Sequence, residues 1–553
     1  MPCICRGHKP VCGNLWLPEN DGSVMSREEP ATHMRTPGPR RRADRTRVLY
    51  IHPAKQGADL PAAHVPMGRP YGLIPLGVPA LVNVLRDAGI DVQGIVLPLE
   101  RQLQPSFDLR AWLAAHQGAY AILIDMHWYE HTYGAIDVAR VCKEVLPEAW
   151  TILGGLSASA FSHEILESCP QVDCVIRGDA ERPLLRLVQR VVRARGDRRR
   201  VNVRSIPNLS WRDGGEVVEN PLTYCASTAD LDRLDFVDID FLAHADRYHV
   251  HEYIVTDLQR TRQARDISRY RGRWICTARG CRYECSYCGG CRTAHQALAG
   301  RQGIVPRSPE AVVADLQRLE GQRVIQASLS YDIAELGEPY WRALFDGMAQ
   351  AGVHIGLYNE FFQLPEPAFV DALAAHADLA HSCVALSPLS GAEAVRHLNG
   401  KRYSNAELFE VLEQLKRHGL SIFCYFSLNL PGEDNATIEE TIDLAARIYD
   451  LYPHDRLKIL TSLHTIDPLS PMAEHPDDFQ IEVDMTSFHD YYEYCRQTQL
   501  ALPLSRTELF RGFRPRRRAV SEPGARDLAH MADVWDAARQ GRESSWWPVP
   551  PSW

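Results

Sequence analysis

Residues 281 to 288 are Cys281-Arg-Tyr-Glu-Cys285-Ser-Tyr-Cys288, and they decide how the rest of the chain is interpreted. The three thiols are spaced by three and then two residues, in a glycine-bearing loop directly after a predicted strand at Trp274 to Thr277. Thiolates hold iron–sulfur clusters, and three of them leave the fourth iron of a four-iron cluster open to another ligand. We therefore predict that Cys281, Cys285 and Cys288 are the ligands of a metal centre.

Two other metal sites use thiols at similar spacings. A structural zinc ion would recruit Cys276 or Cys291 as a fourth ligand, and Cys285, Cys288 and Cys291 also have the C-x2-C-x2-C spacing of bacterial ferredoxins. The ferredoxin pattern lacks its following x3-C-P, and the sequence offers no second pair of cysteines nearby for zinc. Neither alternative accounts for the regular pattern downstream, so the cluster with an open iron is preferred.

The cysteines stand at the start of a series of strands and helices that alternate along the chain. Further strands are predicted at Val324 to Leu329, His354 to Tyr358, Ser382 to Leu386, Ile422 to Leu428 and Leu457 to Leu460. Such alternation is typical of a parallel sheet covered by helices, and barrels of this kind place their chemistry at the carboxyl ends of the strands. The predicted fold class is α/β, with a full or partial (β/α) barrel over residues 271–475.

The cysteine loop resembles that of the radical S-adenosylmethionine (radical SAM) superfamily, in which an aromatic residue usually precedes the last cysteine, here Tyr287. The resemblance implies that the open iron of a [4Fe-4S] cluster chelates S-adenosylmethionine. An electron from the cluster would then break the sulfonium bond and give a 5′-deoxyadenosyl radical. Such an enzyme takes its electrons from an external donor, which we expect to be a flavodoxin or a ferredoxin-like protein.

Polar segments follow two of the predicted strands. Where the superfamily commonly has a Gly-Gly-Glu-like and a Glu-Ser-Gly segment, this chain has Ser328-Leu-Ser-Tyr-Asp332 and Leu386-Ser-Pro-Leu-Ser-Gly391, so it departs from both patterns. The resemblance implies polar contacts to S-adenosylmethionine from these segments and from the cysteine loop. The residues predicted to make them are Tyr287, Ser330, Asp332, Ser387 and Ser390.

An earlier series of strands and helices begins at Arg47. Strands are predicted at Val48 to Ile51, Asp91 to Leu97, Ala121 to Asp125, Thr151 to Leu153 and Val172 to Ile176. The segments Leu153-Gly-Gly-Leu-Ser157 and Asp173-Cys-Val-Ile-Arg-Gly-Asp179 resemble those of the Rossmann-like cobalamin-binding domain fused to many radical enzymes. The resemblance implies that Gly154, Gly155 and Ser157 make room for the nucleotide tail of cobalamin, because glycines permit close backbone approach.

A histidine ligand to cobalt is not expected in this domain. Many cobalamin proteins supply one from Asp-x-His-x-x-Gly after the first strand, whereas Asp125-Met-His127 follows the third predicted strand, and Glu130 stands where the glycine should be. By resemblance, the lower face of cobalamin would lie near Arg69 to Gly77 and Asp125 to Trp128. Arg69, Asp125 and His127 are therefore predicted to contact the cofactor. A Rossmann-like domain without cobalamin is the alternative.

A cobalamin domain joined to this barrel implies methyl transfer to a centre that nucleophilic methylases cannot use. The segments Tyr358-Asn-Glu-Phe-Phe362 and Leu398-Asn-Gly-Lys401 resemble the phosphinate P-methylase family of phosphinothricin-type antibiotic biosynthesis. Tyr358, Glu360 and Lys401 are the predicted catalytic residues, with Lys401 or Arg402 meeting the anionic oxygens of the substrate. The alternatives are a C-methylase of an unactivated carbon, a cobalamin-dependent radical cyclase, and a cobalamin- or redox-sensing module that is not an enzyme.

Composition limits the partners. The formal net charge is −9, so the surface as a whole is not an electrostatic footprint for nucleic acid. The sequence has no run of 18 or more apolar residues and no apolar signal region, so we expect a cytoplasmic protein with a small-molecule substrate and no membrane partner. Of the 15 cysteines, five fall between Cys276 and Cys291, which favours metal binding over disulfides.

The predicted domain boundaries follow these changes of pattern. Residues 1–44 form a disordered tail, rich in Pro, Gly and Arg, and residues 45–190 form the cobalamin-binding domain. Residues 191–270 are a linker that includes a possible hairpin at Asn208 to Gly215, and residues 271–475 form the barrel. Residues 476–553 are a C-terminal extension, in which Tyr491, Tyr492 and Tyr494 are placed to cover the barrel mouth.

Overall fold

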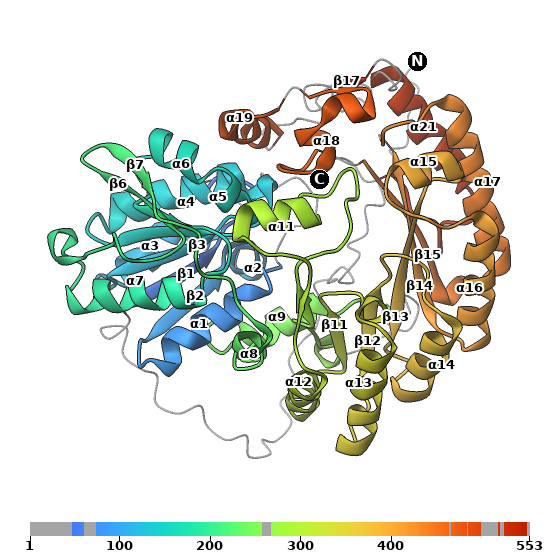
Figure 1. Ribbon diagram of the computed structural model, residues 1–553, viewed down its shortest axis with the longest axis horizontal. Helices are drawn as coiled ribbons and strands as arrows, with labels where there is room; N and C mark the ends of the chain where they lie inside the picture. The colour runs from blue at the N-terminus through green and yellow to red at the C-terminus, as the bar shows by residue number, and fades with distance from the viewer. Residues whose placement is uncertain are drawn as a thin grey trace, which may run out of the picture.

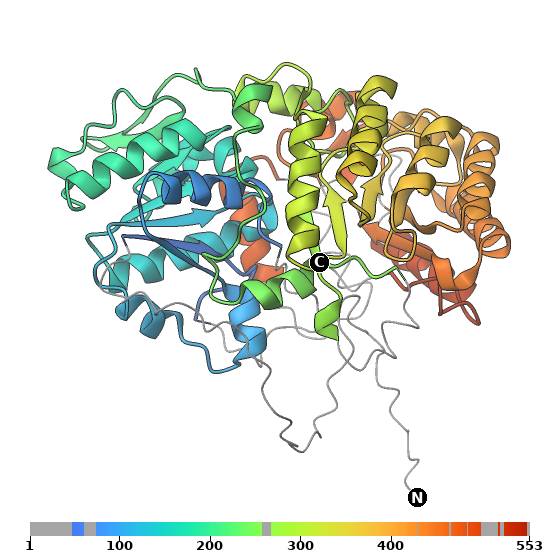
Figure 2. The ribbon, with the colours of Figure 1, turned by 90° about the horizontal axis from the view of Figure 1, so that it is seen from below.

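The computed structural model describes residues 47–59, 73–256, 267–428, 430–463, 466–483, 485–498, 518–519 and 525–549. Most of its strands gather into two separate sheets with helices packed against them, and the two halves lie side by side in both ribbon views (Figure 1 and Figure 2). Among the described residues, the structure has no helix with both the length and the apolar character that crossing a bilayer requires. Each half is a sheet of mainly parallel strands covered by helices, which confirms the predicted α/β fold class.

The first sheet has the strand order β2-β1-β3-β4-β5-β6-β7. Its parallel strands are β1 (Val48–His52), β2 (Val92–Val96), β3 (Ala121–Asp125), β4 (Trp150–Gly154) and β5 (Cys174–Ile176). The chain passes from β1 to β2 on one side and later to β3 on the other, so the strand order reverses between β1 and β3. Open parallel sheets bind ligands at such a switch point, outside the carboxyl ends of the strands.

Helices cover both faces of this sheet, because its strands present apolar side chains in both directions. Val48 and Tyr50 of β1 belong to a core shared with α1 (Gly77–Asp87) and α7 (Glu181–Arg193). Leu49 and Ile51 point the other way, into a core shared with α3 (Leu109–Ala114) and α4 (Thr132–Val145). Short helices in the connections are α2 (Leu97–Leu103), α5 (Leu156–Ala160) and α6 (Ser162–Ser168). The arrangement is the Rossmann-like one that the sequence predicts.

The predicted hairpin is present, and it belongs to the first sheet. β6 (Leu209–Asp213) and β7 (Glu216–Glu219) pair in antiparallel fashion, and β6 also pairs with β5. The two residues between them, Gly214 and Gly215, have φ of 60° and 102°, which a two-residue hairpin turn requires and which glycine adopts without strain. This part of the predicted linker, residues 191–270, is therefore the edge of a folded sheet. The rest includes α8 (Thr228–Leu231) and α9 (Ala245–Glu252).

The second sheet is parallel throughout, in the order β15-β14-β13-β12-β11-β8. Its strands are β8 (Gly272–Ile275), β11 (Gln326–Leu329), β12 (Gly356–Glu360), β13 (Cys383–Leu389), β14 (Ser421–Leu428) and β15 (Leu457–Leu463). In the described residues β8 and β15 are the two edges of this sheet, so the barrel is partial rather than full.

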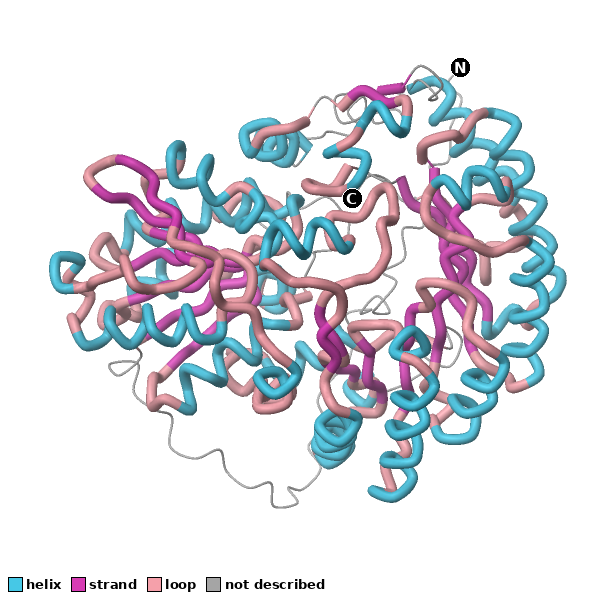
Figure 3. The backbone as a smooth tube through the Cα atoms, in the orientation of Figure 1, coloured by secondary structure: helices cyan, strands magenta, loops and turns pink. Residues whose placement is uncertain are grey.

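Helices line the outer side of the second sheet (Figure 1 and Figure 3). They are α12 (Pro309–Gly321), α13 (Glu338–Ala351), α14 (Pro367–His376), α16 (Asn405–Arg417) and α17 (Asn435–Leu451). In α16, Leu408, Leu412 and Leu415 are buried at helical spacing, and each stabilises the core by roughly 1.5–3 kcal/mol. Smaller elements are β9 (Ala278–Arg279), β10 (Val305–Pro306), α11 (Arg292–Ala299), α15 (Glu393–Leu398), α18 (Pro471–Glu474), β16 (Ile481–Glu482) and β17 (Arg518–Ala519).

The C-terminal segment docks on both halves of the molecule. α19 (Phe488–Thr498) packs on the first half, where the Tyr491 ring lies 5.4 Å from that of Phe161. Tyr491 contacts both halves: its ring is buried against the Rossmann-like half, and its hydroxyl donates to the Ile466 carbonyl, just after β15, at 3.0 Å. α21 (Ala525–Ala538) packs on the second half through Trp535, whose ring lies 5.7 Å from that of Phe426.

The buried histidine of α9 makes stability depend on pH. His249 is 4% exposed and lies against the Gly272 carbonyl, and burial, together with Arg273 and Arg271, lowers its pKa to about 4. The unfolded chain, with a histidine pKa of about 6.5, binds more protons as pH falls from 6.5 toward 4, so the native state loses stability in that window. We expect His249 to account for a fall of about 2 kcal/mol between pH 7 and pH 5.

Urea unfolding at the two pH values measures this loss. His249→Gln should make the free energy of unfolding less dependent on pH by that amount. His163→Gln is the matched control because His163 is 55% exposed at its side chain. An equal pH dependence in wild type and His249→Gln would refute the assignment.

Candidate active site

A cavity of about 960 Å³ lies between the two halves and is lined by both. The first half contributes residues at the carboxyl ends of its strands and from the helices beside them: Tyr50, Val78, Leu123, Asp125, His127, Gly154, Gly155 and Leu184. The second half contributes Cys281, Cys285, Tyr287, Cys288, Ser330, Glu360, Ser387 and Lys401. The carboxyl ends of the two sheets therefore open into one shared cavity.

The three predicted cysteine ligands lie together on this cavity, in the loop between β9 and α11. The Tyr283 N–H donates to Cys281 Sγ at 3.4 Å, and the Gly290 N–H donates to Cys288 Sγ at 3.3 Å. Burial raises the pKa of the Cys281 and Cys285 thiols, so metal binding has to displace their protons. Half-buried cysteines that line a cavity, two of them with backbone donors aimed at the sulfur, suit the thiolate ligands of an iron–sulfur cluster.

Two residues that the sequence analysis left without a role hold this loop in place. Asn399 is fully buried and accepts a hydrogen bond of 2.5 Å from Ser286 Oγ. Gly400 has φ of 95°, and a Cβ there would lie 3.1 Å from Cys285 Sγ. Both belong to the segment Leu398-Asn-Gly-Lys401, which therefore supports the cysteine loop and then brings Lys401 to the cavity.

The predicted contacts to S-adenosylmethionine divide into two groups. Tyr287, Ser330 and Ser387 line the cavity, as expected. Asp332 does not, because its buried carboxylate accepts from Asn359 Nδ2 at 3.0 Å and from the Phe362 N–H at 2.8 Å.

Ser390 is also absent from the cavity lining. Its fully buried hydroxyl lies 3.1 Å from Thr441 Oγ1 and accepts from the Ala392 N–H. In this structure Asp332 and Ser390 brace the loops around the site and are not among the residues that line the cavity.

The predicted catalytic residues form a charged wall. Glu360 and Lys401 line the cavity, and Tyr358 lies behind them with its hydroxyl donating to Glu360 Oε1 at 2.7 Å. Lys401 Nζ donates to the Phe362 carbonyl at 2.7 Å. Desolvation inside the cavity raises the pKa of Glu360, whose side chain is accessible there, and burial lowers the pKa of Lys401. Arg402 is exposed and lies outside this cavity, so of the two predicted anion-binding cations only Lys401 is in position.

On the opposite wall, Asp125, His127, Gly154 and Gly155 all line the cavity. Burial lowers the pKa of His127 to about 4, so its imidazole is neutral at pH 7. Gly155 has φ of 119°, and a Cβ there would come within 2.7 Å of the His127 backbone, so no larger residue fits.

Ser157, another predicted contact of this half, is not on the cavity. The Ser157 hydroxyl instead donates to the His127 carbonyl at 3.1 Å and fixes the loop from behind. Arg69 lies outside the described residues.

An ion-pair network joins the two halves beside the cavity, and the sequence analysis missed it. Arg279 donates to Asp179 Oδ1 at 3.0 Å and to Glu181 Oε1 at 2.6 Å, and Arg301 also pairs with Asp179. The acids follow β5, whereas the arginines flank the cysteine loop. The motif ending in Asp179 is visible in the sequence, but no local pattern indicates partners about a hundred residues away.

Comparison with known proteins shows which proteins this chain resembles. Residues 275–445 match the family model of the radical SAM superfamily. The anaerobic magnesium-protoporphyrin IX monomethyl ester cyclase of Cereibacter sphaeroides is 24% identical over 387 residues, which is 69% of this chain and 56% of that protein. The hopanoid C-3 methylase of Methylococcus capsulatus is 24% identical over 52% of this chain and 48% of that protein. The chain thus spans about half the length of these relatives.

Solved structures support the fold over nearly the whole chain. The radical S-adenosylmethionine methyltransferase TsrM from Kitasatospora setae, with cobalamin and a [4Fe-4S] cluster bound, superposes with a TM-score of 0.60 at 14% identity and covers 91% of both chains. TsrM with tryptophan and a SAM analogue gives a TM-score of 0.56 at 15% identity, over 77% of this chain and 74% of TsrM. At this identity the likeness concerns the fold. With the family match over residues 275–445, it follows that the chain carries a radical SAM enzyme domain, whose cofactors are a [4Fe-4S] cluster and S-adenosylmethionine.

Proposed function

We propose that this protein is a cobalamin-dependent radical SAM methyltransferase that transfers a methyl group to a radical centre on a small substrate. The observation that carries the proposal is the single cavity shared by the cysteine loop and the carboxyl ends of the first sheet. Two cofactors held on opposite walls of one cavity can act on one substrate without moving it to a second site.

The residues on the first wall suit cobalamin. Gly154, Gly155 and Gly178 line the cavity at the ends of β4 and β5. Gly154 leaves its backbone open, whereas Gly155 and Gly178, with φ of 119° and 61°, let the His127 backbone and the Leu298 carbonyl pack close beside the cavity. Apolar side chains such as Val78 and Leu184 line a trough between α1 and α7 that would accept a nucleotide tail. When bound there, cobalamin would supply the methyl group. The fold likeness to TsrM, which holds cobalamin in a solved structure, supports this assignment.

On the second wall, Cys281, Cys285 and Cys288 would hold the cluster, and the cluster with S-adenosylmethionine would supply the radical. Ser330 and Ser387 stand where they can donate to polar groups of S-adenosylmethionine. An external electron donor, a flavodoxin or a ferredoxin-like protein, would reduce the cluster.

The charged side chains on one wall of the cavity indicate which class of substrate it can bind. Lys401 offers an ammonium group to an anion, Glu360 offers a carboxylate to a cation, and Tyr358 orients that carboxylate. A buried cation binds an anionic oxygen more strongly than an exposed one. We therefore propose a phosphinate with a P–H bond as the methyl acceptor, held by its oxygens at Lys401, as in antibiotic biosynthesis of the phosphinothricin type.

Two other reactions have support from particular relatives. The hopanoid C-3 methylase favours a carbon acceptor, and the magnesium-protoporphyrin cyclase favours ring closure. Methylation of a carbon and ring closure would both start from the two cofactors proposed for this cavity. The product of turnover therefore distinguishes these reactions from P-methylation.

The test is anaerobic turnover of the reconstituted protein with cobalamin, a reductant, S-adenosylmethionine labelled with ¹³C at the methyl group, and candidate phosphinates. We expect 5′-deoxyadenosine together with a new ¹³C–³¹P coupling in the phosphorus NMR spectrum. Lys401→Met should weaken phosphinate binding while leaving the cluster spectrum intact, and Arg402→Met, outside the cavity, should change neither.

Each other outcome has a definite meaning. Label on carbon of a carbon substrate would retain methyl transfer and reject the phosphorus acceptor. A cyclised product without label would reject methyl transfer. Failure to form 5′-deoxyadenosine with cluster, reductant and S-adenosylmethionine present would favour a sensing module over an enzyme.

A further inference from the structure

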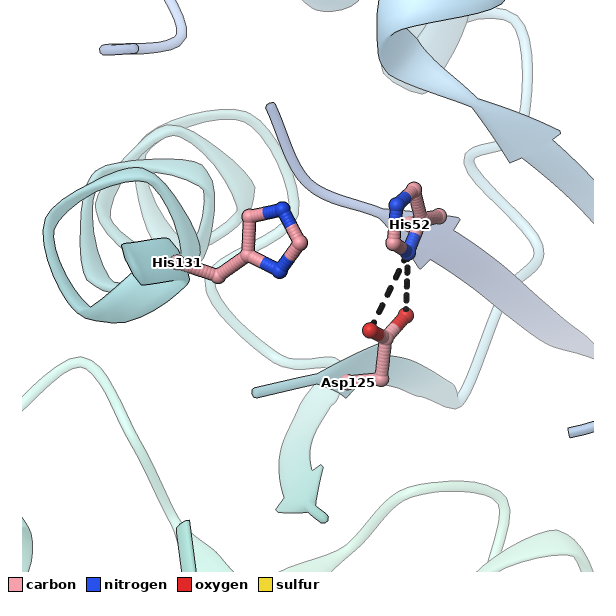
Figure 4. Close-up of side chains that lie close together, drawn as sticks. All are labelled: His52, Asp125 and His131. Carbon is pink, nitrogen blue, oxygen red and sulfur yellow. Dashed lines mark hydrogen bonds and ion pairs between the residues drawn. The ribbon is translucent and has the colours of Figure 1, made fainter. Parts of the chain in front are cut away.

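Three metal-ligating side chains meet inside the first half, apart from the cysteine loop. His52, Asp125 and His131 each offer one ligand atom, and these atoms all lie within 4.8 Å of one another. The three side chains converge from separate backbone segments (Figure 4). All are buried, with exposures of 0%, 6% and 0%. Two imidazoles and a carboxylate are a ligand set for zinc and for iron(II).

The sheet topology places this group at its switch point. His52 ends β1, Asp125 ends β3, and the two strands are parallel neighbours in register through Ile51 and Ile124. His131 ends the short helix η3 (Tyr129–His131), which follows β3. The strand order reverses between β1 and β3, so the ligand atoms lie at the position where open α/β sheets bind ligands.

The spacing of the ligand atoms suits a metal ion. His52 Nδ1 lies 3.0 Å from each carboxylate oxygen of Asp125. With metal–ligand bonds of about 2.1 Å, two ligand atoms lie about 3.0 Å apart at a right angle and about 3.4 Å apart at a tetrahedral angle. The His131 ring stands almost perpendicular to that of His52, at 85° and 5.1 Å between centroids. The ligand atom that His131 offers lies within 4.8 Å of those of His52 and Asp125.

The surroundings of the carboxylate also fit. Tyr50 donates its hydroxyl to Asp125 Oδ1 at 2.6 Å. Carboxylates that bind metals are usually held by such an outer hydrogen bond, which fixes their orientation. Tyr50 and Asp125 both line the cavity, whereas His52 and His131 are not among its lining residues. An ion here would therefore sit in the cavity floor and hold the Asp125 carboxylate from behind.

We propose that His52, Asp125 and His131 bind one divalent transition-metal ion, for which Zn²⁺ is the probe, independently of the iron–sulfur cluster. The site joins β1, β3 and η3 at the switch point and fixes the floor of the shared cavity. It involves none of the cysteines, so it does not depend on the proposed methyl transfer.

The experiment uses the full-length chain with its cluster reconstituted. After chelation, one equivalent of Zn²⁺ is added and the bound zinc is counted by mass spectrometry of the metal. We expect one tightly bound ion, and X-ray absorption at the zinc edge should show only nitrogen and oxygen neighbours at about 2.0–2.2 Å. A sulfur shell at about 2.3 Å would place the zinc on cysteines instead and overturn the proposal.

Variants connect the ion to these residues. His52→Ala and His131→Ala should each lower zinc affinity by more than about 100-fold, because even the loss of an outer-shell partner costs 10–100-fold. His163→Ala, an exposed histidine paired with Glu167, is the matched control and should retain the ion.

Folding of the variants is checked separately. His52→Gln keeps a polar group of similar size, and its circular dichroism without metal should match that of wild type. Zn²⁺ should raise the melting temperature of wild type and of His163→Ala, but not that of His52→Gln. Equal zinc binding by wild type and the folded His52→Gln protein would overturn the proposal.

Discussion

Replacing Cys288 by alanine is expected to abolish the four-iron absorption spectrum and, with it, formation of 5′-deoxyadenosine. Cys288 lies on the shared cavity and receives the Gly290 N–H, and it is one of only three thiols in the predicted ligand set. Losing one ligand leaves two irons without a protein thiolate, so the cluster can no longer form with a single open iron. Activity should fall to the background of the uncatalysed mixture, and Cys281→Ala and Cys285→Ala should behave alike.

Cys291→Ala is the matched control. Cys291 is buried three residues further on, but it is absent from the cavity lining. The variant should keep the cluster spectrum and the 5′-deoxyadenosine yield. If Cys291→Ala lost the cluster and Cys281→Ala kept it, the ferredoxin-like set of Cys285, Cys288 and Cys291 would be correct.

The second large effect is expected from Asp179→Ala. Burial alone would raise the pKa of Asp179, but Arg279 and Arg301 hold it below its ordinary value. Removing the carboxylate leaves both guanidinium groups without this partner, and one of them, Arg301, is 2% exposed. Breaking a buried pair costs about 3–5 kcal/mol. Because the pair spans the two halves, the loss should also loosen the cavity between them and lower cobalamin retention.

Chemical unfolding followed by fluorescence measures this cost. Asp213→Ala is the control, since the Arg204–Asp213 pair is 66% and 42% exposed and should contribute only about 0–1 kcal/mol. The Asp179 contribution is fully present above a pH of about 4 and is lost as the pH falls through the lowered native pKa. A loss below 1 kcal/mol in Asp179→Ala would mean that the network does not hold the halves together.

Several features of the site were predictable because they are local. The C-x3-C-x2-C spacing lies within eight residues, so the sequence alone indicates that the three sulfurs can meet. The Gly154–Gly155 pair follows a strand with clear apolar character, which places it at a carboxyl end. Glu360 and Lys401 also belong to recognisable segments, and the structure brings both to the cavity.

The serine segments show where local reasoning fails. Ser387 and Ser390 are three residues apart, which in a strand places them on opposite faces, and only Ser387 reaches the cavity. The pairing of β13 with β14 shifts register between Leu386 and Leu389, and Leu389 has φ of 65°. β13 ends at Leu389, and the Ser390 hydroxyl turns to Thr441 of α17, a contact that no local pattern in the sequence indicates.

The C-terminal segment shows a second failure. Its helices share no common hydrophobic pattern, because α19 packs on the first half and α21 on the second. The pattern of each helix reflects the surface that it covers. Without knowledge of those surfaces, the tyrosines of α19 could not be placed.

The sequence by itself determined the three-cysteine loop, the two series of strands and helices, and the glycine-bearing end of β4, because each depends on residues close together in the chain. The tertiary structure decided which side chains line the cavity, how Arg279 and Asp179 join the halves, and that His52, Asp125 and His131 converge at one switch point. These depend on strand order, register and docking, which bring together residues far apart in the chain.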